Sequence, residues 1–364
     1  MRKIALALIP VLILSACGRQ NPPKPIIPLV QEIMANEGNP YNKMLNEARP
    51  SKDGEICIIG SEEAVLRIAD IFAQADERDN VNGSSIPDGL PDFAGETISC
   101  IIDTLNYPYE QYLESNNQEL LKRITVQHVL TAIDTAYNIS PFDEVGLGSK
   151  GRAKLIVLAD PYLAQYGGFD ADTLLRTFGC DVPIIAPLDI ILSERIAQTK
   201  GTPTGILCNP RFTATGIYSV RFRDIASRNG VTKADCVVFP TPTDSTDIMK
   251  SFLDRYIAAG FTKPLNSLLI DDFNANPEEV KTSLANLISL MNEESVTYRK
   301  YIAEDFRVYE SGAALKEECF SFLRNTNRFT HKISKPVISV YYSHSGHGEK
   351  EGSSVLIPDS YVQN

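Results

Sequence analysis

Polar side chains follow most of the short apolar runs in this sequence, where chemistry on a small molecule would need them. In open parallel sheets, ligands bind beyond the carboxyl ends of the strands, where helix N-termini present free N–H groups. Hydroxyls, amides, carboxylates and a guanidinium gathered there suit a sugar, a polyol or a similar small polar metabolite better than a lipid. The candidate ligand-binding residues are Ser61, Asp92, Asp160, Tyr162, Asp189, Asn209, Arg211, Thr241, Asp244, Asp271 and Asp272.

Each of these residues also has a plainer explanation, as a helix cap or a turn residue. Arg211 points most clearly to a ligand, because a cation at the start of a helix opposes the local dipole and favours an anion. Asp92 belongs to the turn-rich segment 86–96, which could bind a cation or cover a cleft. The alternative is an ordinary turn in which Asp92 caps the following helix.

Paired cysteines offer a different chemistry. Cys57 and Cys208 stand at matching places in the two halves of the chain, and thiols that face each other across a cleft could carry out a racemase-type proton transfer. Both lie inside apolar runs, however, which favours buried thiols that pack as small hydrophobic groups. Free core thiols rather than disulfides are therefore expected, although an even number of them permits disulfides in an exported protein. The other cysteines of this group are Cys100, Cys180, Cys236 and Cys319.

Metal and cofactor sites have little support in the sequence. His344 and His347, with Glu349 nearby, could hold a metal, but they lie in a glycine-rich tail where histidines on solvated turns are commoner. No CxxC spacing indicates zinc, and no phosphate-binding glycine motif or nucleophile elbow is present. We therefore expect no metal, no cofactor and no catalytic residue.

Short apolar runs alternate with longer amphipathic segments from residue 55 onward, the pattern of parallel sheets covered on both faces by helices. This alternation predicts an α/β fold with two doubly wound parallel-sheet lobes and an interlobe cleft. Strands are expected at 56–60, 154–159, 182–186, 205–208, 236–239, 267–270, 306–309 and 337–342. Helices are expected after Ser61, over 93–105, 120–136, 172–178, 214–227, 245–259 and 313–323, and from about 277.

The N-terminus resembles a bacterial lipoprotein signal. Arg2 and Lys3 precede an apolar run, and Leu14-Ser15-Ala16-Cys17 resembles the box in which the chain is cut before a lipid-bearing cysteine. An ordinary secretory signal or a short core segment is the alternative. The signal places the protein in a bacterial cell envelope, lipid-anchored through Cys17 and facing the periplasm or the cell surface.

Length and charge limit the remaining possibilities. The chain has 364 residues, enough for two domains, and a formal net charge of −11, which disfavours nucleic acid as a partner. The expected division is a signal peptide at 1–16, a proline-rich tether at 17–50 and a first lobe at 51–198 that 329–364 could complete. The second lobe then spans 199–328, and the best linker is 199–204.

Residues 204–272 carry a resemblance to a known family. The run Ile206–Pro210, the helix that follows it and the strand end Leu268–Phe273 resemble the second lobe of type I periplasmic binding proteins, which the sugar-binding core of the lac-repressor family shares. The glycine that this family places before the acidic pair is absent here. The resemblance implies two open lobes that clamp a ligand between them.

The sequence thus favours a lipid-anchored lipoprotein, similar to periplasmic binding proteins, that captures a small polar ligand without catalysis. One alternative is a two-lobed α/β enzyme of racemase type that uses Cys57 and Cys208. Another is an envelope lipoprotein that binds a protein partner, of unknown identity, at the membrane.

Overall fold

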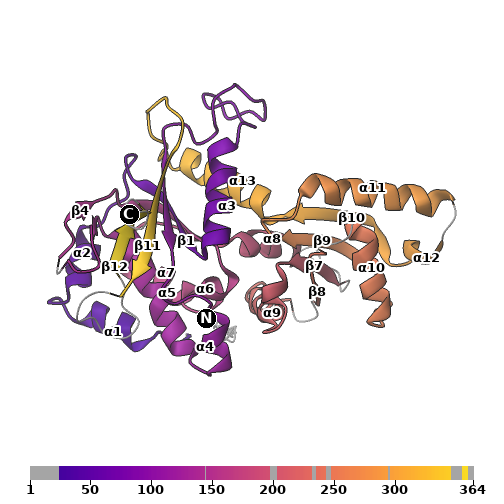
Figure 1. The fold of residues 1–364 in the computed structure, drawn as a ribbon, viewed down its shortest axis with the longest axis horizontal. Helices are drawn as coiled ribbons and strands as arrows, with labels where there is room; N and C mark the ends of the chain where they lie inside the picture. Colours follow the sequence, from indigo (N-terminus) through magenta and orange to yellow (C-terminus); the bar gives the residue numbers. More distant parts are fainter. Residues whose placement is uncertain are drawn as a thin grey trace, which may run out of the picture.

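The described part of the chain folds into two α/β lobes joined side by side (Figure 1). The computed structural model describes residues 24–143, 145–196, 203–231, 235–242, 247–293, 296–345 and 355–359. Within these ranges, no helix is both long enough and apolar enough to cross a bilayer. The predicted fold class is confirmed.

The first lobe contains a six-stranded sheet with the order β12-β11-β2-β1-β5-β6. All neighbouring strands are parallel except β12, which is antiparallel to β11 at one edge. The strands are β1 (Glu55–Gly60), β2 (Thr97–Ile102), β5 (Ala153–Leu158), β6 (Ile184–Ile185), β11 (Val337–His344) and β12 (Val355–Pro358). A small hairpin, β3 (Ala136–Tyr137) and β4 (Gly148–Ser149), lies beside this sheet.

Helices bury both faces of this sheet, which explains why its central strands are largely apolar. Ile56 and Ile58 of β1 pack with α3 (Glu62–Gln74) and α13 (Ser311–Asn325) on one face. Cys57 and Ile59 point to the opposite face and pack with α5 (Gln118–Ile133). The other helices of this lobe are α1 (Pro28–Ala35), α2 (Pro40–Glu47), α4 (Glu110–Glu114), α6 (Pro161–Gln165), α7 (Gly168–Thr177) and α8 (Pro187–Ile196).

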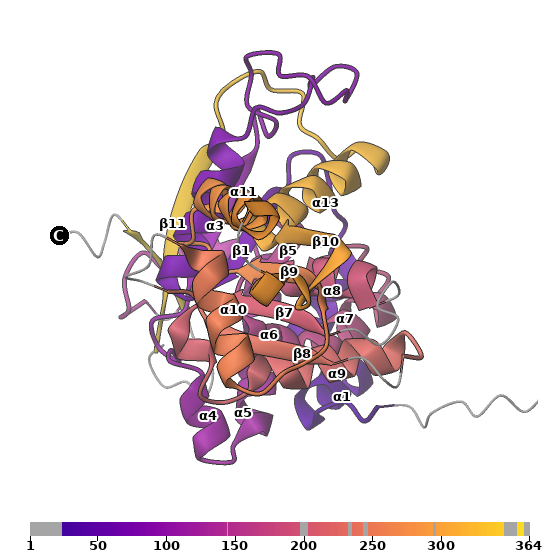
Figure 2. The same ribbon diagram turned by 90° about the vertical axis from the view of Figure 1, so that its right-hand side faces the viewer.

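The second lobe has a four-stranded parallel sheet with the order β10-β9-β7-β8. Its strands are β7 (Thr204–Cys208), β8 (Cys236–Pro240), β9 (Leu265–Asp271) and β10 (Ile302–Glu310). In Figure 2, which looks onto this lobe, the sheet lies between α9 on one side and α10 and α11 on the other. The helical segments are η1 (Pro210–Phe212), α9 (Ile217–Arg228), α10 (Ile248–Ala258), α11 (Pro277–Glu293) and α12 (Val296–Arg299).

The chain passes between the lobes after α8 and again where β10 meets α13. The second lobe therefore ends at residue 310 rather than at the expected 328, because Leu315, Cys319 and Leu323 of α13 pack on the sheet of the first lobe. The C-terminal strand β11 completes that sheet, as expected. Residues 199–202 of the expected linker lie outside the described residues, and Thr204 at its end begins β7.

Two other expectations differ from the structure. Residues 97–102 form the buried strand β2, although the pattern over 93–105 predicted a helix, because short apolar runs do not separate a buried strand from a helix. Residues 28–35 and 40–47 lie in the expected tether but form α1 and α2, and α1 packs on α7. The six cysteines after Cys17 are free, as predicted.

A buried ion pair holds the base of the first lobe together. Lys154 on β5 contacts Glu96 at 2.6 Å, and both side chains are almost completely buried. The Lys154 ammonium also donates to the carbonyl oxygens of Lys52 and Arg328, and Glu96 accepts from the backbone of Thr330. The pair thus fastens the C-terminal segment to the central strands.

Candidate functional site

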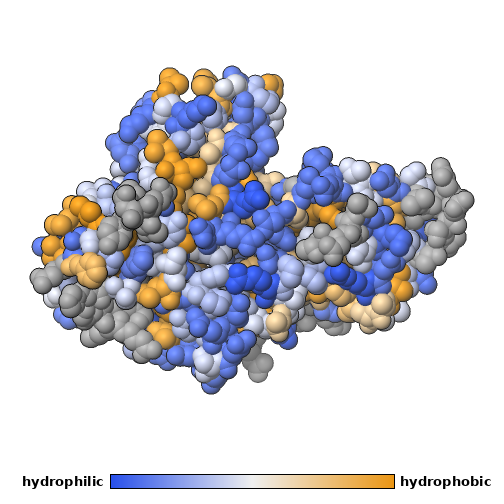
Figure 3. All heavy atoms as spheres, viewed as in Figure 1, coloured by the Kyte–Doolittle hydropathy of each residue, from blue (hydrophilic) through white to orange (hydrophobic). Residues whose placement is uncertain are grey.

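A small pocket lies between the lobes at the carboxyl ends of β1, β5, β7 and β9, with a volume of about 30 Å³. Parallel strands present ligand-binding groups at this end, so its position agrees with the sequence analysis. The surface over the junction of the lobes is strongly hydrophilic (Figure 3). The lining residues are Ser61, Glu63, Ala64, Tyr107, Ala159, Pro161, Asn209, Arg211, Phe212, Tyr218, Asp271, Asp272, Phe273 and Asn274.

Asp160 is the first of two carboxylates buried at this junction. It directly follows β5, and its Oδ1 accepts the backbone N–H of Tyr162 at 2.9 Å, so the residue caps α6. Its other oxygen, Oδ2, is buried and makes no hydrogen bond with the described residues. The pKa of Asp160 is raised to about 7, chiefly by burial and in part by the charges of Glu110 and Asp271, against the opposing effects of the Tyr162 N–H and Arg211. Asp160 can therefore gain or lose a proton near neutral pH.

Asp271 is its counterpart on the second lobe, at the end of β9. Its Oδ2 accepts a hydrogen bond of 2.8 Å from the Tyr218 hydroxyl, and the Ser311 hydroxyl is a second donor to the carboxylate that lowers its pKa. Burial is the main cause that raises the pKa of Asp271, and the carboxylates of Asp272 and Asp189 add to it. Each lobe thus contributes one buried carboxylate with a raised pKa, Asp271 in the pocket lining and Asp160 buried beside it.

Arg211 provides the positive charge among the described residues that line the pocket. Its guanidinium stacks on the Tyr107 ring, 4.5 Å from the ring centroid, and lies 3.6 Å from the Glu110 carboxylate. Because its side chain is 39% exposed and this ion pair is long, Arg211 is able to exchange Glu110 for an anionic ligand.

A buried network holds the loop that carries Tyr107. Asp103, just after β2, accepts hydrogen bonds from Ser343 at 2.6 Å, Asn106 at 2.9 Å and Tyr109 at 3.1 Å, and its Oδ2 lies 2.7 Å from His128 Nε2. Burial alone would raise the pKa of Asp103, but the His128 charge and these hydrogen bonds lower it well below its usual range. The ionised carboxylate is therefore the centre of the network.

We expect Asp103→Asn to lower the free energy of unfolding at pH 7 by on the order of 3 kcal/mol, because several buried donors lose a charged acceptor. The loss shrinks as pH falls below about 4, since a group with a lowered folded-state pKa stabilises only above its unfolded pKa. Urea unfolding at pH 3 and pH 7 measures both values. An equal loss at the two pH values would contradict the assigned charge of Asp103.

Contacts between the lobes close the pocket in this structure. Arg221 on α9 pairs with Asp189 on α8, with a hydrogen bond of 2.6 Å from its Nε, and the Tyr162 and Thr215 hydroxyls lie 2.5 Å apart. Asn274 on the second lobe also contacts Glu63 on the first. A cavity of about 30 Å³ holds about one water molecule, so a substrate must enter while the lobes are apart.

The structure gathers many of the residues that the sequence predicted, but not all. Ser61, Asn209, Arg211, Asp271 and Asp272 line the pocket. Asp160 and Tyr162 are buried beside it, and Asp189 lines a smaller adjoining cavity with Arg221 and Asp271. The predicted residues for which the structure gives no place in the pocket are Asp92, Thr241, Asp244 and Cys17.

These four residues have separate explanations. Asp92 accepts the backbone N–H groups of Glu77 and Arg78, so it orders the turn-rich segment. Thr241 donates to the carbonyl of Cys208 at the end of the second sheet. Asp244 and Cys17 lie outside the described residues, as do His347 and Glu349, so the lipid anchor stays a prediction.

Neither cysteine of the proposed pair lines the pocket. Cys57 is buried in the core on one face of β1, where burial raises its pKa to about 12. Cys208 is also buried, and both burial and the nearby Asp271 and Asp272 raise its pKa far above the usual range. A thiolate base at either position is strongly disfavoured at neutral pH.

Tyr107, Glu110 and Phe212 belong to the site but were missed in the sequence. Tyr107 and Glu110 follow β2. The candidates were the residues that follow expected strands, and because this strand was interpreted as a helix, the residues after it were not considered. Phe212 packs edge-on against Tyr162, with the ring centroids 5.8 Å apart. It has no polar side-chain group, so a search for polar residues after strands could not identify it.

Comparisons with known proteins gave matches among solved structures alone: no family model and no curated protein matches the chain. A glutamate racemase isoform from Bacillus anthracis is 14% identical, with a TM-score of 0.48, over 81% of this chain and 90% of that one. A glutamate racemase from Francisella tularensis, solved with D-glutamate, is 12% identical, with a TM-score of 0.49, over 86% and 95%. An aspartate racemase from Picrophilus torridus is 13% identical, with a TM-score of 0.33, over 75% and 95%.

These matches correct the resemblance drawn from residues 204–272. The similar structures are glutamate and aspartate racemases, not periplasmic binding proteins or lac-repressor cores, so that resemblance is wrong. The function built on it, a periplasmic-binding-protein-like lipoprotein that captures a small polar ligand, is wrong with it. Strand alternation misled because many unrelated two-lobed proteins share it, and fold does not imply function.

Proposed function

We propose that the protein is a racemase-type enzyme that moves a proton at a carbon atom of a small anionic substrate, with Asp160 and Asp271 as its acid–base pair. The observation that carries this proposal is the placement of one buried carboxylate on each lobe at the interlobe junction, where Oδ2 of Asp160 makes no hydrogen bond with the described residues. Titratable groups whose pKa values are raised by burial and by neighbouring carboxylates are typical of acid–base catalysis at neutral pH.

The proposed step needs no reagent beyond the substrate. The ionised carboxylate takes the proton from a carbon next to the substrate's carboxylate group, and the C–H electron pair passes into that group to form an enolate. The protonated carboxyl on the other lobe then donates its proton to the opposite face, so that the electron pair returns to a new C–H bond. The carbon is inverted, and the two aspartates have exchanged protonation states.

Arg211 fits the role of substrate anchor. Its guanidinium can bind the substrate carboxylate in place of Glu110, and it would also stabilise the negative charge that grows there in the enolate. Closure of the lobes would exclude water and bring the second aspartate to the reacting carbon.

The carboxylate pair replaces the cysteines of the enzyme alternative considered in the sequence analysis. The pKa values of Cys57 and Cys208 are raised far from neutrality, whereas the pKa of Asp160 is about 7 and Asp271 lines the pocket. Two general bases on opposite lobes serve the same reaction, whichever residue type supplies them.

The proposal is tested by incubating the folded protein in D₂O with amino acids, hydroxy acids and sugar acids as single stereoisomers. We expect one class to lose its Cα–H signal by NMR while its stereoisomer accumulates. No exchange across the panel would overturn the proposal, and so would exchange that persists in the Asp160→Asn, Asp271→Asn double variant.

A further inference from the structure

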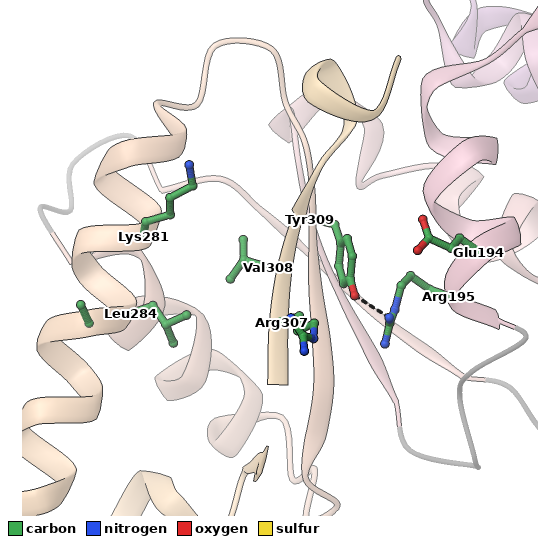
Figure 4. Close-up of a pocket in the computed structure, with 8 residues that line it drawn as sticks. Glu194, Arg195, Lys281, Leu284, Arg307, Val308 and Tyr309 are labelled. Atoms are coloured by element: carbon green, nitrogen blue, oxygen red, sulfur yellow. Dashed lines mark hydrogen bonds between the residues drawn. The ribbon is translucent and has the colours of Figure 1, made fainter. Parts of the chain in front are cut away.

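A second, larger pocket lies at the hinge, outside the interlobe site. It has a volume of about 680 Å³ and is bounded by the end of α8, by α11 and by β10 (Figure 4). Both passages of the chain between the lobes adjoin it, since α8 precedes one and β10 precedes the other. The lining residues are Glu194, Arg195, Lys281, Leu284, Ala285, Arg307, Val308 and Tyr309.

The lining of this hinge pocket is positively charged. Arg195, Lys281 and Arg307 contribute three cations against the single carboxylate of Glu194. The chain as a whole has a formal net charge of −11, so such an excess of positive charge differs from the rest of the molecule. A cationic concavity in an acidic protein attracts anions to that place specifically.

Arg195 is held in position rather than left free to move. It is 6% exposed, its guanidinium stacks 4.5 Å from the centroid of the Tyr309 ring, and it donates a hydrogen bond of 2.5 Å to the Tyr309 hydroxyl. Figure 4 shows Arg195 and Arg307 on the same side of β10, with Tyr309 above them. A preorganised guanidinium loses little entropy when it binds an anion.

Arg307 and Lys281 are the exposed cations of the hinge pocket. Arg307 lies on β10, an edge strand of its sheet, and forms no ion pair with any described carboxylate. Lys281 contacts Glu278 at 2.6 Å, but both side chains are more than half exposed, so water and salt weaken that pair. Both cations are therefore available to a ligand.

We propose that the hinge pocket binds a small polyanion, a metabolite that carries phosphate groups or several carboxylates. Arg195 belongs to the first lobe and Arg307 to the second, on the same side of β10, so the ligand bridges the lobes beside both chain passages, while Lys281 lies across the strand from them (Figure 4). Binding favours the interlobe arrangement in which these cations lie together. This inference does not depend on the chemistry assigned to Asp160 and Asp271.

The test is calorimetric titration of the full chain with pyrophosphate and, separately, with citrate, in a buffer of constant ionic strength. We expect saturable binding of at least one, and the stronger of the two identifies phosphate or carboxylate as the preferred group. Arg307→Gln should weaken the affinity for the stronger probe by about tenfold or more, because a charge-assisted contact with the anion is lost. Arg176→Gln, an exposed arginine on α7, is the matched control and should bind as the unmodified protein does.

Arg211→Gln separates this pocket from the interlobe site. The Arg211→Gln variant should bind pyrophosphate and citrate as tightly as the unmodified protein does. If Arg211→Gln lost the binding and Arg307→Gln kept it, the anion would bind between the lobes and the proposal would be overturned. Absence of saturable binding by both probes would also overturn it. Thermal unfolding of each variant verifies that the fold is intact.

Discussion

Replacing Asp160 with asparagine is expected to slow the proposed proton transfer by about 10²–10⁴-fold, the usual contribution of a positioned acid or base. Asparagine keeps the size of the side chain and still accepts the N–H of Tyr162, so α6 retains its cap. It cannot exchange a proton. Turnover in D₂O, measured once the substrate class is known, gives the ratio.

The same substitution should stabilise the protein at high pH. The pKa of Asp160 is raised to about 7 in the folded state, above its unfolded value, so its contribution is fully present below about pH 4 and is lost as pH rises through 7. Because asparagine does not titrate, the variant does not lose stability in this pH range. Its free energy of unfolding should match that of the unmodified protein near pH 4 and exceed it by on the order of 3 kcal/mol at pH 8.

Urea unfolding at the two pH values measures this gain, and Asp172→Asn, an exposed carboxylate of the same lobe, serves as the control. A catalytic carboxylate that is costly to bury gives lower turnover together with higher stability. If Asp160→Asn were no more stable than the unmodified protein at pH 8, the carboxylate would be well satisfied in the fold. The acid–base role would then lose its basis.

Lys154→Met is expected to lower the free energy of unfolding by about 3–5 kcal/mol, because it leaves the Glu96 carboxylate buried without its partner. The carbonyl oxygens of Lys52 and Arg328 would lose their donor as well. Equilibrium urea unfolding at pH 7 provides the measurement.

Two further variants make this result specific. Glu96→Gln added to Lys154→Met should recover much of the loss, since the uncompensated charge is then gone. Lys250→Met breaks an exposed i,i+4 pair with Asp254 and should cost less than about 1 kcal/mol. If Lys154→Met and Lys250→Met lowered the free energy of unfolding equally, the buried Lys154–Glu96 pair would contribute no more to stability than an exposed pair.

Local pattern determined a large part of this fold. Runs such as 56–60 and 268–270 are apolar at every position, as is typical of a parallel strand buried on both faces, and each lies within a strand of the structure. Residues directly after such strands, including Asp160 and Asp271, could be placed at the ligand end of their sheets without coordinates. The alternation of elements therefore specified two α/β lobes and part of the interlobe lining.

Only the tertiary structure decided which of those residues are buried together and what their surroundings do to them. Asp160 and Asp271 are far apart in the chain, and their electrostatic coupling exists because the lobes close on each other. The same packing encloses Cys57 and Cys208, turns 97–102 into a strand and brings Tyr107 under Arg211. Periodicity encodes which face of an element is apolar, but pKa values and partners depend on long-range contacts that no local pattern contains.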